Sequence, residues 1–180
     1  MAGCGQTRWR AAVAVAGCTA LLGAGCATGR HDAPAHESAS RTATTSGLAS
    51  RSARRALQAQ YLVIARAGNR RLEADFDPLE ERDRNDLGRA KADLRDAAAT
   101  ERLFDRRLLR IVFPPETERV AHDLYRINQV RATLTTAAAA STSLRRLHAY
   151  EPRLDAANAP VEQAVTTIRR QLGLPPPDTS

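Results

Sequence analysis

The residues best suited to chemistry in this sequence are two pairs of a glutamate and a histidine. Glu118 and His122 are four residues apart, and His148 and Glu151 are three apart, so each pair would share one face of a helix. A di-iron site in a helical bundle needs two Glu-x-x-His repeats and further inward glutamates. The first pair has another spacing, the second has the reverse order, and neither repeats. We therefore expect ordinary polar pairs, with no metal and no cofactor.

Short motifs that mark common catalytic sites do not occur in the sequence. It contains no Cys-x-x-Cys-His haem motif, no glycine-rich phosphate or dinucleotide loop, and no Gly-x-Ser-x-Gly turn. The two remaining histidines, His31 and His36, lie in a segment without large apolar side chains, where we expect them to be solvated. We predict a protein without enzymatic activity.

Arginine supplies almost all of the positive charge. The chain has 27 basic and 20 acidic residues, a formal net charge of +7, and Lys91 is its only lysine. No acid lies between Leu124 and Tyr150, so arginines in and beyond this stretch are candidates for contact with anionic lipid headgroups or an acidic wall polymer. The candidate contacts are Arg126, Arg131, Arg145, Arg146, Arg169 and Arg170. The alternative is that tertiary neighbours pair with these arginines. We expect no nucleic-acid partner, because no aromatic residues are interleaved with them.

The first part of the chain has the pattern of an export signal. Arg8 and Arg10 form a short basic start, and no charged side chain follows from residue 11 to residue 29. This run is rich in alanine and glycine, whereas a transmembrane helix would need roughly 20 strongly apolar residues. All three cysteines lie within the first 26 residues, so the body of the protein has neither a disulfide nor a thiolate metal site.

The apolar run ends in Leu21-Leu22-Gly23-Ala24-Gly25-Cys26, which resembles the lipobox of bacterial lipoproteins. The resemblance implies that residues 1–25 are a signal peptide, that the Cys26 thiol is acylated, and that the protein is held on the extracytoplasmic face of the cell membrane. Gly23 stands where the family usually has an aliphatic residue. Cys18, preceded by Val-Ala-Gly, is the alternative acylation site, although the apolar run before it is short. An ordinary secretory signal or an uncleaved anchor is the other interpretation.

The rest of the chain divides into a linker, a helical domain and a tail. Residues 27–47 contain no large apolar side chain and cannot bury enough surface to offset their ordering entropy. We predict a flexible tether over residues 26–47, a helical domain over 48–173 and a disordered, proline-rich tail over 174–180. The body resembles small helical lipoproteins of GC-rich Gram-positive bacteria, a general likeness that implies no site residues.

Apolar residues recur at steps of three and four, which predicts four helices. The first should run from Leu48 to Phe76. Asp77, Pro78 and Glu80 have the pattern of a capping box that starts the second helix, which should reach Val112. The third should extend from Pro115 to the region of His148. In the fourth, either Asn158 caps a shorter helix or the chain bends at Pro160, and Gly173 should end it.

Two features of these helices concern packing. Gly68 lies within the first apolar stripe, where it would allow a neighbouring helix to approach closely. Residues 132–143 are unusually small, which favours close helix packing, with a shallow groove as the alternative.

No segment alternates in the way a strand does, so we predict an all-α fold, an elongated antiparallel four-helix bundle. The function we expect is that of a membrane-anchored, non-enzymatic lipoprotein that engages another cell-envelope component through a helix face. The alternative is a bundle that binds a lipid or another small molecule in its interior or along residues 132–143.

Overall fold

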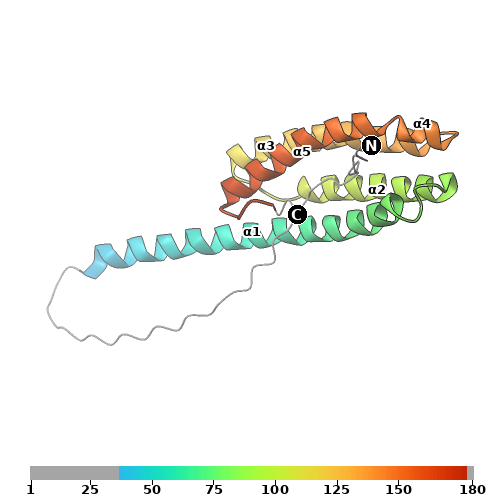
Figure 1. The fold of residues 1–180 in the computed structure, drawn as a ribbon. Helices are drawn as coiled ribbons and strands as arrows, with labels where there is room; N and C mark the ends of the chain where they lie inside the picture. Colours follow the sequence, from blue (N-terminus) through green and yellow to red (C-terminus); the bar gives the residue numbers. More distant parts are fainter. Residues whose placement is uncertain (1–36, 178–180) are drawn as a thin grey trace, which may run out of the picture.

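The computed structural model describes the backbone of residues 37–177 and the side chains of residues 50–177 (Figure 1). Within these residues the elements are α1 (Glu37–Glu80), α2 (Leu87–Leu108), α3 (Pro115–Ala139), α4 (Leu144–His148) and α5 (Glu151–Leu172). No strand occurs in this part of the chain, so the predicted all-α fold is confirmed. The predicted signal peptide 1–25, Cys18 and Cys26 lie outside the described residues.

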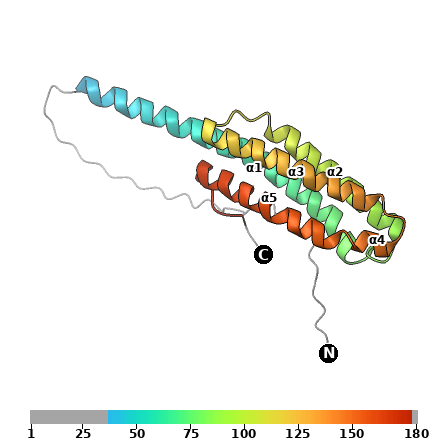
Figure 2. The same ribbon diagram turned by 90° about the horizontal axis from the view of Figure 1, so that it is seen from above.

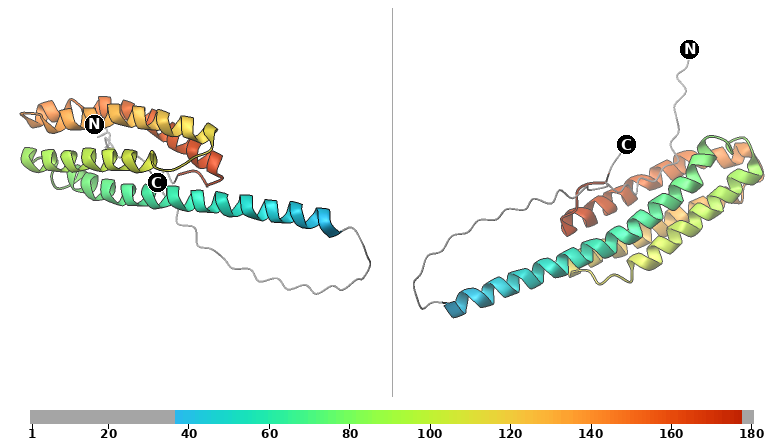
Figure 3. Two further views of the ribbon diagram at one scale, coloured as in Figure 1. Left: turned by 180° about the vertical axis from the view of Figure 1, so that it is seen from behind. Right: turned by 90° about the horizontal axis from the view of Figure 1, so that it is seen from below.

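The four long helices run antiparallel and follow one another around an elongated body. α1 packs along α2, α2 along α3 and α3 along α5, whereas α1 and α5 approach each other much less closely (Figure 1). A hydrogen bond from Nε2 of Gln58 to the carbonyl oxygen of Leu172, 2.7 Å long, joins α1 to the end of α5. The N-terminal part of α1 extends beyond the other helices, and α4 lies at the opposite end (Figure 2, Figure 3).

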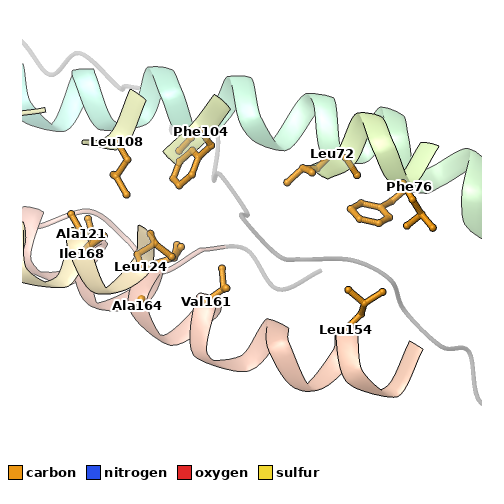
Figure 4. Packing of buried hydrophobic residues seen from close by; sticks show 14 of the residues in the cluster. Leu72, Phe76, Phe104, Leu108, Ala121, Leu124, Leu154, Val161, Ala164 and Ile168 are labelled. Carbon is orange, nitrogen blue, oxygen red and sulfur yellow. The ribbon is translucent and has the colours of Figure 1, made fainter. Parts of the chain in front are cut away.

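Side chains from all four long helices form one apolar core (Figure 4). Its larger buried members are Tyr61, Leu72, Phe76, Leu79, Leu94, Phe104, Leu108, Phe113, Leu124, Leu147, Leu154, Val161, Val165, Ile168 and Leu172. The predicted stripes of α1, α2 and α5 supply most of these side chains. Burial of this apolar surface, at about 25 cal/mol per Å², is the main force that holds the helices together.

Gly68 lies where α1 packs against α2. A side-chain carbon added at Gly68 would be 3.6 Å from Cδ2 of Phe104, so the phenylalanine ring occupies the space beside the glycine. This contact agrees with the prediction that Gly68 faces a neighbouring helix.

α1 is longer than predicted at both ends. It begins at Glu37 and not at Leu48, so the last part of the predicted linker 26–47 is helical. No proline occurs between Pro34 and Pro78, and the sequence therefore has no strong helix breaker over this stretch. At the other end, α1 continues past Phe76 and through Pro78.

The last turn of α1 is held by burial. Leu79 is only 2% exposed, and its packing holds the turn although Pro78 has no amide hydrogen to donate. The predicted capping box of Asp77 and Glu80 is therefore wrong, because both residues belong to α1. α2 begins instead at Leu87, and its cap is Asp86, the residue immediately before it.

The break between α2 and α3 lies near the prolines, as predicted. Pro115 is the first residue of α3, and Pro114 precedes it in an extended conformation. α2 ends at Leu108, earlier than the predicted Val112. The amide of Ile111 donates to the carbonyl oxygen of Leu108 at 3.1 Å, so the chain turns here before the prolines are reached.

α3 ends earlier than predicted. We expected one helix from Pro115 to the region of His148, whereas α3 stops at Ala139 and α4 is separate. Ser143 caps α4, and its hydroxyl accepts a hydrogen bond from the amide of Arg146 at 3.3 Å. Hydroxyl side chains of this kind bond to nearby backbone amides and favour a helix boundary over a helix interior.

α5 is continuous and ends at the predicted glycine. Gly173 has a φ of 70°, in the left-handed region that glycine adopts readily. Pro160 lies inside α5, so the interpretation in which Asn158 caps a shorter helix is wrong. Asn158 is buried among the packed helices. Residues 174–177 follow without regular structure.

Candidate functional site

The two glutamate–histidine pairs do not form a metal site. Glu118 and His122 are both exposed on α3. Nδ1 of His148 contacts Oε1 of Glu151, which makes this an ordinary polar pair between α4 and α5. Among the described residues, no three histidine, cysteine or acidic side chains come together in a way that could hold a metal ion.

Two of the six arginines predicted to contact an anionic surface are buried, and that prediction is wrong for them. Arg131 is 2% exposed, and its Nη2 lies 3.1 Å from Oε1 of Glu101. Arg169 is 1% exposed, and its Nε donates to the carbonyl oxygen of Pro175 at 2.7 Å. Both guanidinium groups are engaged inside the protein, so they cannot meet a surface.

The other four arginines do not gather into one patch. Arg126 pairs with Asp123 on the surface of α3. Arg145 and Arg146 are exposed on α4, at the start of α5, whereas Arg170 is exposed near the end of α5. At 1.5 Å per residue, the length of α5 separates the two groups by about 30 Å.

A different surface combines apolar and basic side chains. A groove of about 460 Å³ lies between α1 and the end of α2, and we call it the α1–α2 groove. Its lining residues are Ala59, Gln60, Val63, Ile64, Arg107, Arg110 and Ile111. Val63 is 68% exposed, an unusual state for a valine whose neighbours on the same helix supply the core. Val112, next to the groove in sequence, is 89% exposed.

Helix periodicity explains how α1 presents this surface. Arg55, Ala59 and Val63 are four residues apart, and Arg66 and Arg70 follow at steps of three and four, so all five share the outer face of α1. All five are exposed. On the other side of the groove, the turn after α2 places Arg110 and Ile111 beside them.

The α1 and α2 segments around the groove expose arginines and no acid. Residues 50–72 of α1 contain no acid and the arginines Arg51, Arg54, Arg55, Arg66, Arg70 and Arg71. The acids in the last turns of α2, Glu101 and Asp105, are 2% and 0% exposed. Their carboxylates face α3, so the outer surface of these two helix segments is basic. In the sequence, this surface is indicated by a long acid-free stretch in the first helix. From the sequence we considered only the later acid-free stretch, between Leu124 and Tyr150.

The interior of the bundle contains a polar layer between α2 and α3. Beside the Glu101–Arg131 pair, Asp105 accepts hydrogen bonds from Nδ2 of Asn128 at 2.9 Å and from Nε2 of Gln129 at 2.7 Å. Burial raises the pKa of Asp105 to about 6, and the two hydrogen bonds oppose this rise. Burial also raises the pKa of Glu101, with Arg131 opposing it.

This polar layer leaves little free space. A cavity between Gly68, Phe104, Leu124 and the Glu101–Arg131 pair has a volume of about 10 Å³. A cavity of about 10–15 Å³ is needed to hold one water molecule. The space is therefore far too small for a lipid or another organic ligand.

A second hollow lies where α3, α4 and α5 meet, and we call it the α3–α5 hollow. Its volume is about 550 Å³. The polar lining consists of Ser141, Thr142, Arg146, Tyr150 and Arg153, and alanines from the same segments complete it.

The small residues 132–143 have two roles in the structure. Ala132, Ala138 and Ala139 are buried and allow close packing of α3, the interpretation that we favoured. Ala137 and Ala140 line the α3–α5 hollow, in agreement with the alternative of a shallow groove. Some residues of this segment therefore pack closely against neighbouring helices, and others line a hollow.

None of the described helices is both long enough and apolar enough to span a bilayer. Comparison with protein families, with curated proteins and with solved structures finds no match to this chain. A proposal for its function therefore rests on the surfaces described above.

Proposed function

We propose that this chain is a membrane-anchored, extracytoplasmic lipoprotein without enzymatic activity, and that it engages another cell-envelope protein through the α1–α2 groove. The anchor is the acylated thiol of Cys26, as the lipobox-like sequence implies. The observation that carries the interaction role is the exposed apolar floor of the groove, bordered by arginines. Exposed apolar patches rimmed by polar residues are typical of protein interaction sites.

The occupant that we propose for the groove is an acidic amphipathic helix of the partner. Its apolar face would cover Val63, Ile64 and Ile111, and its carboxylates would meet Arg107 and Arg110. Guanidinium groups bind carboxylates with two parallel hydrogen bonds, which supports pairing of this kind. An anionic wall polymer would satisfy the arginines but would leave the apolar floor uncovered.

The small cavity in the polar layer favours this role over binding of a lipid in the bundle interior. Its volume of about 10 Å³ is no more than the space of one water molecule, so it accommodates no acyl chain. The exposed groove, by contrast, is accessible without any change in the packing of the helices.

The groove is lined by residues of α1 and of the end of α2, and α2 ends on the side of the bundle from which α1 extends (Figure 1). A tether attached before α1 would join the bundle at this end. A groove at this end suits a partner that is itself held in or at the same membrane.

Site-specific photocrosslinking in cells tests the proposal. A photoreactive residue at position 63 samples the groove, and one at position 130 is the matched control, because Val130 is also a valine and is 62% exposed on α3. We expect a discrete protein crosslink from position 63 only, to an acidic helical segment, and its loss when Arg107 and Arg110 are both replaced by glutamine. Equal products from both positions, or crosslinks from position 63 to lipid alone, would contradict it.

A further inference from the structure

We propose that the α3–α5 hollow binds a small organic oxyanion, a carboxylate or phosphate monoester attached to a compact apolar body. The hollow is lined by residues of α4 and of the adjoining ends of α3 and α5, and α4 lies at the end of the molecule opposite to the extension of α1 (Figure 2). Its volume of about 550 Å³ is within the range of ordinary small-molecule sites, about 300–1,000 Å³. This proposal does not depend on the function of the groove.

Two arginines of the hollow are held in place by neighbouring side chains. Nη1 of Arg146 donates to Oγ1 of Thr142 at 3.1 Å, which uses one of its five N–H groups. The guanidinium carbon of Arg153 lies 5.4 Å from the centre of the Tyr150 ring, a cation–π distance. Guanidinium groups that are already positioned lose less entropy when they bind an oxyanion.

No acidic side chain belongs to the lining of the hollow. The acids nearest to Arg153 in sequence are Glu151 and Asp155, and Glu151 contacts His148 instead. The hollow lies beside the start of α5 and the ends of α3 and α4, so the helix dipoles there oppose one another and the arginines provide its positive charge.

One residue of the lining, Ser141, carries a buried hydroxyl without a partner in the described part of the chain. Ser141 is 6% exposed, and its Oγ has no hydrogen-bond partner among the described residues. Buried polar groups are normally hydrogen-bonded, and one left unpaired costs about 1–3 kcal/mol. The oxygen is closed off from solvent, so the Ser141 side chain would have to rotate toward the hollow before an oxygen of a bound anion could accept from its hydroxyl. Ala137, Ala140 and Ala149 provide the apolar surface for the remainder of the ligand.

Calorimetric titration of the full chain in detergent with phenyl phosphate tests this inference. The variants are Arg146→Gln and Arg153→Gln, and the matched control is Arg145→Gln, which removes the adjacent exposed arginine of α4 that does not line the hollow. We expect each hollow variant to raise the dissociation constant about tenfold, because a charge-assisted hydrogen bond is lost. The control should leave it unchanged, and Arg146→Lys should retain part of the affinity.

Two further ligands test separately the need for an apolar body and the type of oxyanion that is bound. Inorganic phosphate, which has no apolar body, should bind more weakly than phenyl phosphate, and benzoate tests whether a carboxylate is accepted at the same place. Amide shifts in NMR spectra should be confined to residues 137–153. Equal weakening by all three glutamine variants, shifts located at the α1–α2 groove, or inorganic phosphate binding as tightly as phenyl phosphate would overturn the proposal.

Discussion

The Nη2 atom of Arg131 on α3 lies 3.1 Å from Oε1 of Glu101 on α2, and the two side chains are 3% and 1% exposed. The pair therefore joins two neighbouring helices inside the bundle, away from solvent. Taking both charges out of water costs several kcal/mol per ion, and their mutual attraction offsets that cost only while both partners are present. We infer that the pair contributes more to the register of α2 against α3 than to net stability.

Removal of one partner should be costly, and removal of both should not. We expect Arg131→Met to lower the free energy of unfolding by about 3–5 kcal/mol, because it leaves the Glu101 carboxylate buried without a cation. The double variant Glu101→Leu with Arg131→Met should recover most of this loss. Urea unfolding followed by circular dichroism measures both. A loss below about 1 kcal/mol in the single variant would show that the pair is not buried as described.

Protonation of Asp105 should raise the free energy of unfolding in mild acid. Its pKa is raised by burial to about 6, above the value of about 3.9 in an unfolded chain, so the folded state binds more protons between these values. Stability should therefore rise as the pH falls from about 7 to about 4, with about 2 kcal/mol from this group.

The variant Asp105→Asn tests this origin of the pH dependence. We expect a smaller gain in unfolding free energy between pH 7 and pH 5 than in the wild type. The gain should not vanish, since burial also raises the pKa of Glu101. Asp123→Asn, which removes an exposed aspartate of α3, serves as the control. Parallel pH profiles for Asp105→Asn and the wild type would refute the assignment.

Gly68 should tolerate alanine. The added carbon would meet Phe104 at 3.6 Å, an ordinary van der Waals contact, while alanine has the higher helix propensity. We expect Gly68→Ala to raise the free energy of unfolding by about 0.5–1 kcal/mol. Gly68→Leu should instead be destabilising, because its longer side chain would displace the Phe104 ring. A destabilised alanine variant would mean that α1 and α2 are closer together than the structure shows.

Asp86 should matter as the cap of α2. Its side chain accepts a hydrogen bond from the amide of Arg89 at 3.1 Å. We expect Asp86→Ala to cost about 1 kcal/mol of unfolding free energy and Asp86→Asn to cost much less, because asparagine caps helices equally well. The same cost for both variants would indicate that the negative charge, and not the cap, is what stabilises the helix.

The core helices were predictable from sequence because their apolar residues keep a period of three and four. Tyr61, Leu94 and Ile168 lie on the apolar faces that this period marks, and all three are buried in the core. The helix ends were less predictable. Pro78 and the hydroxyl-rich residues 141–143 favour a helix boundary, whereas burial of the neighbouring apolar residues favours a continued helix. Which preference prevails depends on tertiary packing, and the local sequence does not contain that information.

The charged residues were harder to place. Ala121, Leu124, Asn128, Arg131, Thr135 and Ala138 fall at steps of three and four, and this is the face of α3 that is buried. When α3 is considered alone, a helix face that contains an arginine is expected to be exposed to solvent. Its partner Glu101 lies on a different helix, so only the packing of α2 against α3 identifies Arg131 as an interior residue.

The proposal that the bundle works while tethered to a membrane is tested most directly by the intact mass of the protein recovered from the membrane fraction of a bacterial host, compared with Cys26→Ala. We predict a chain that begins at Cys26 and carries diacylglyceryl, together with an unprocessed, unacylated product from the variant. Recovery of the wild-type protein from the soluble fraction, with residues 1–26 still attached and no lipid, would contradict the anchor and the location proposed for this protein.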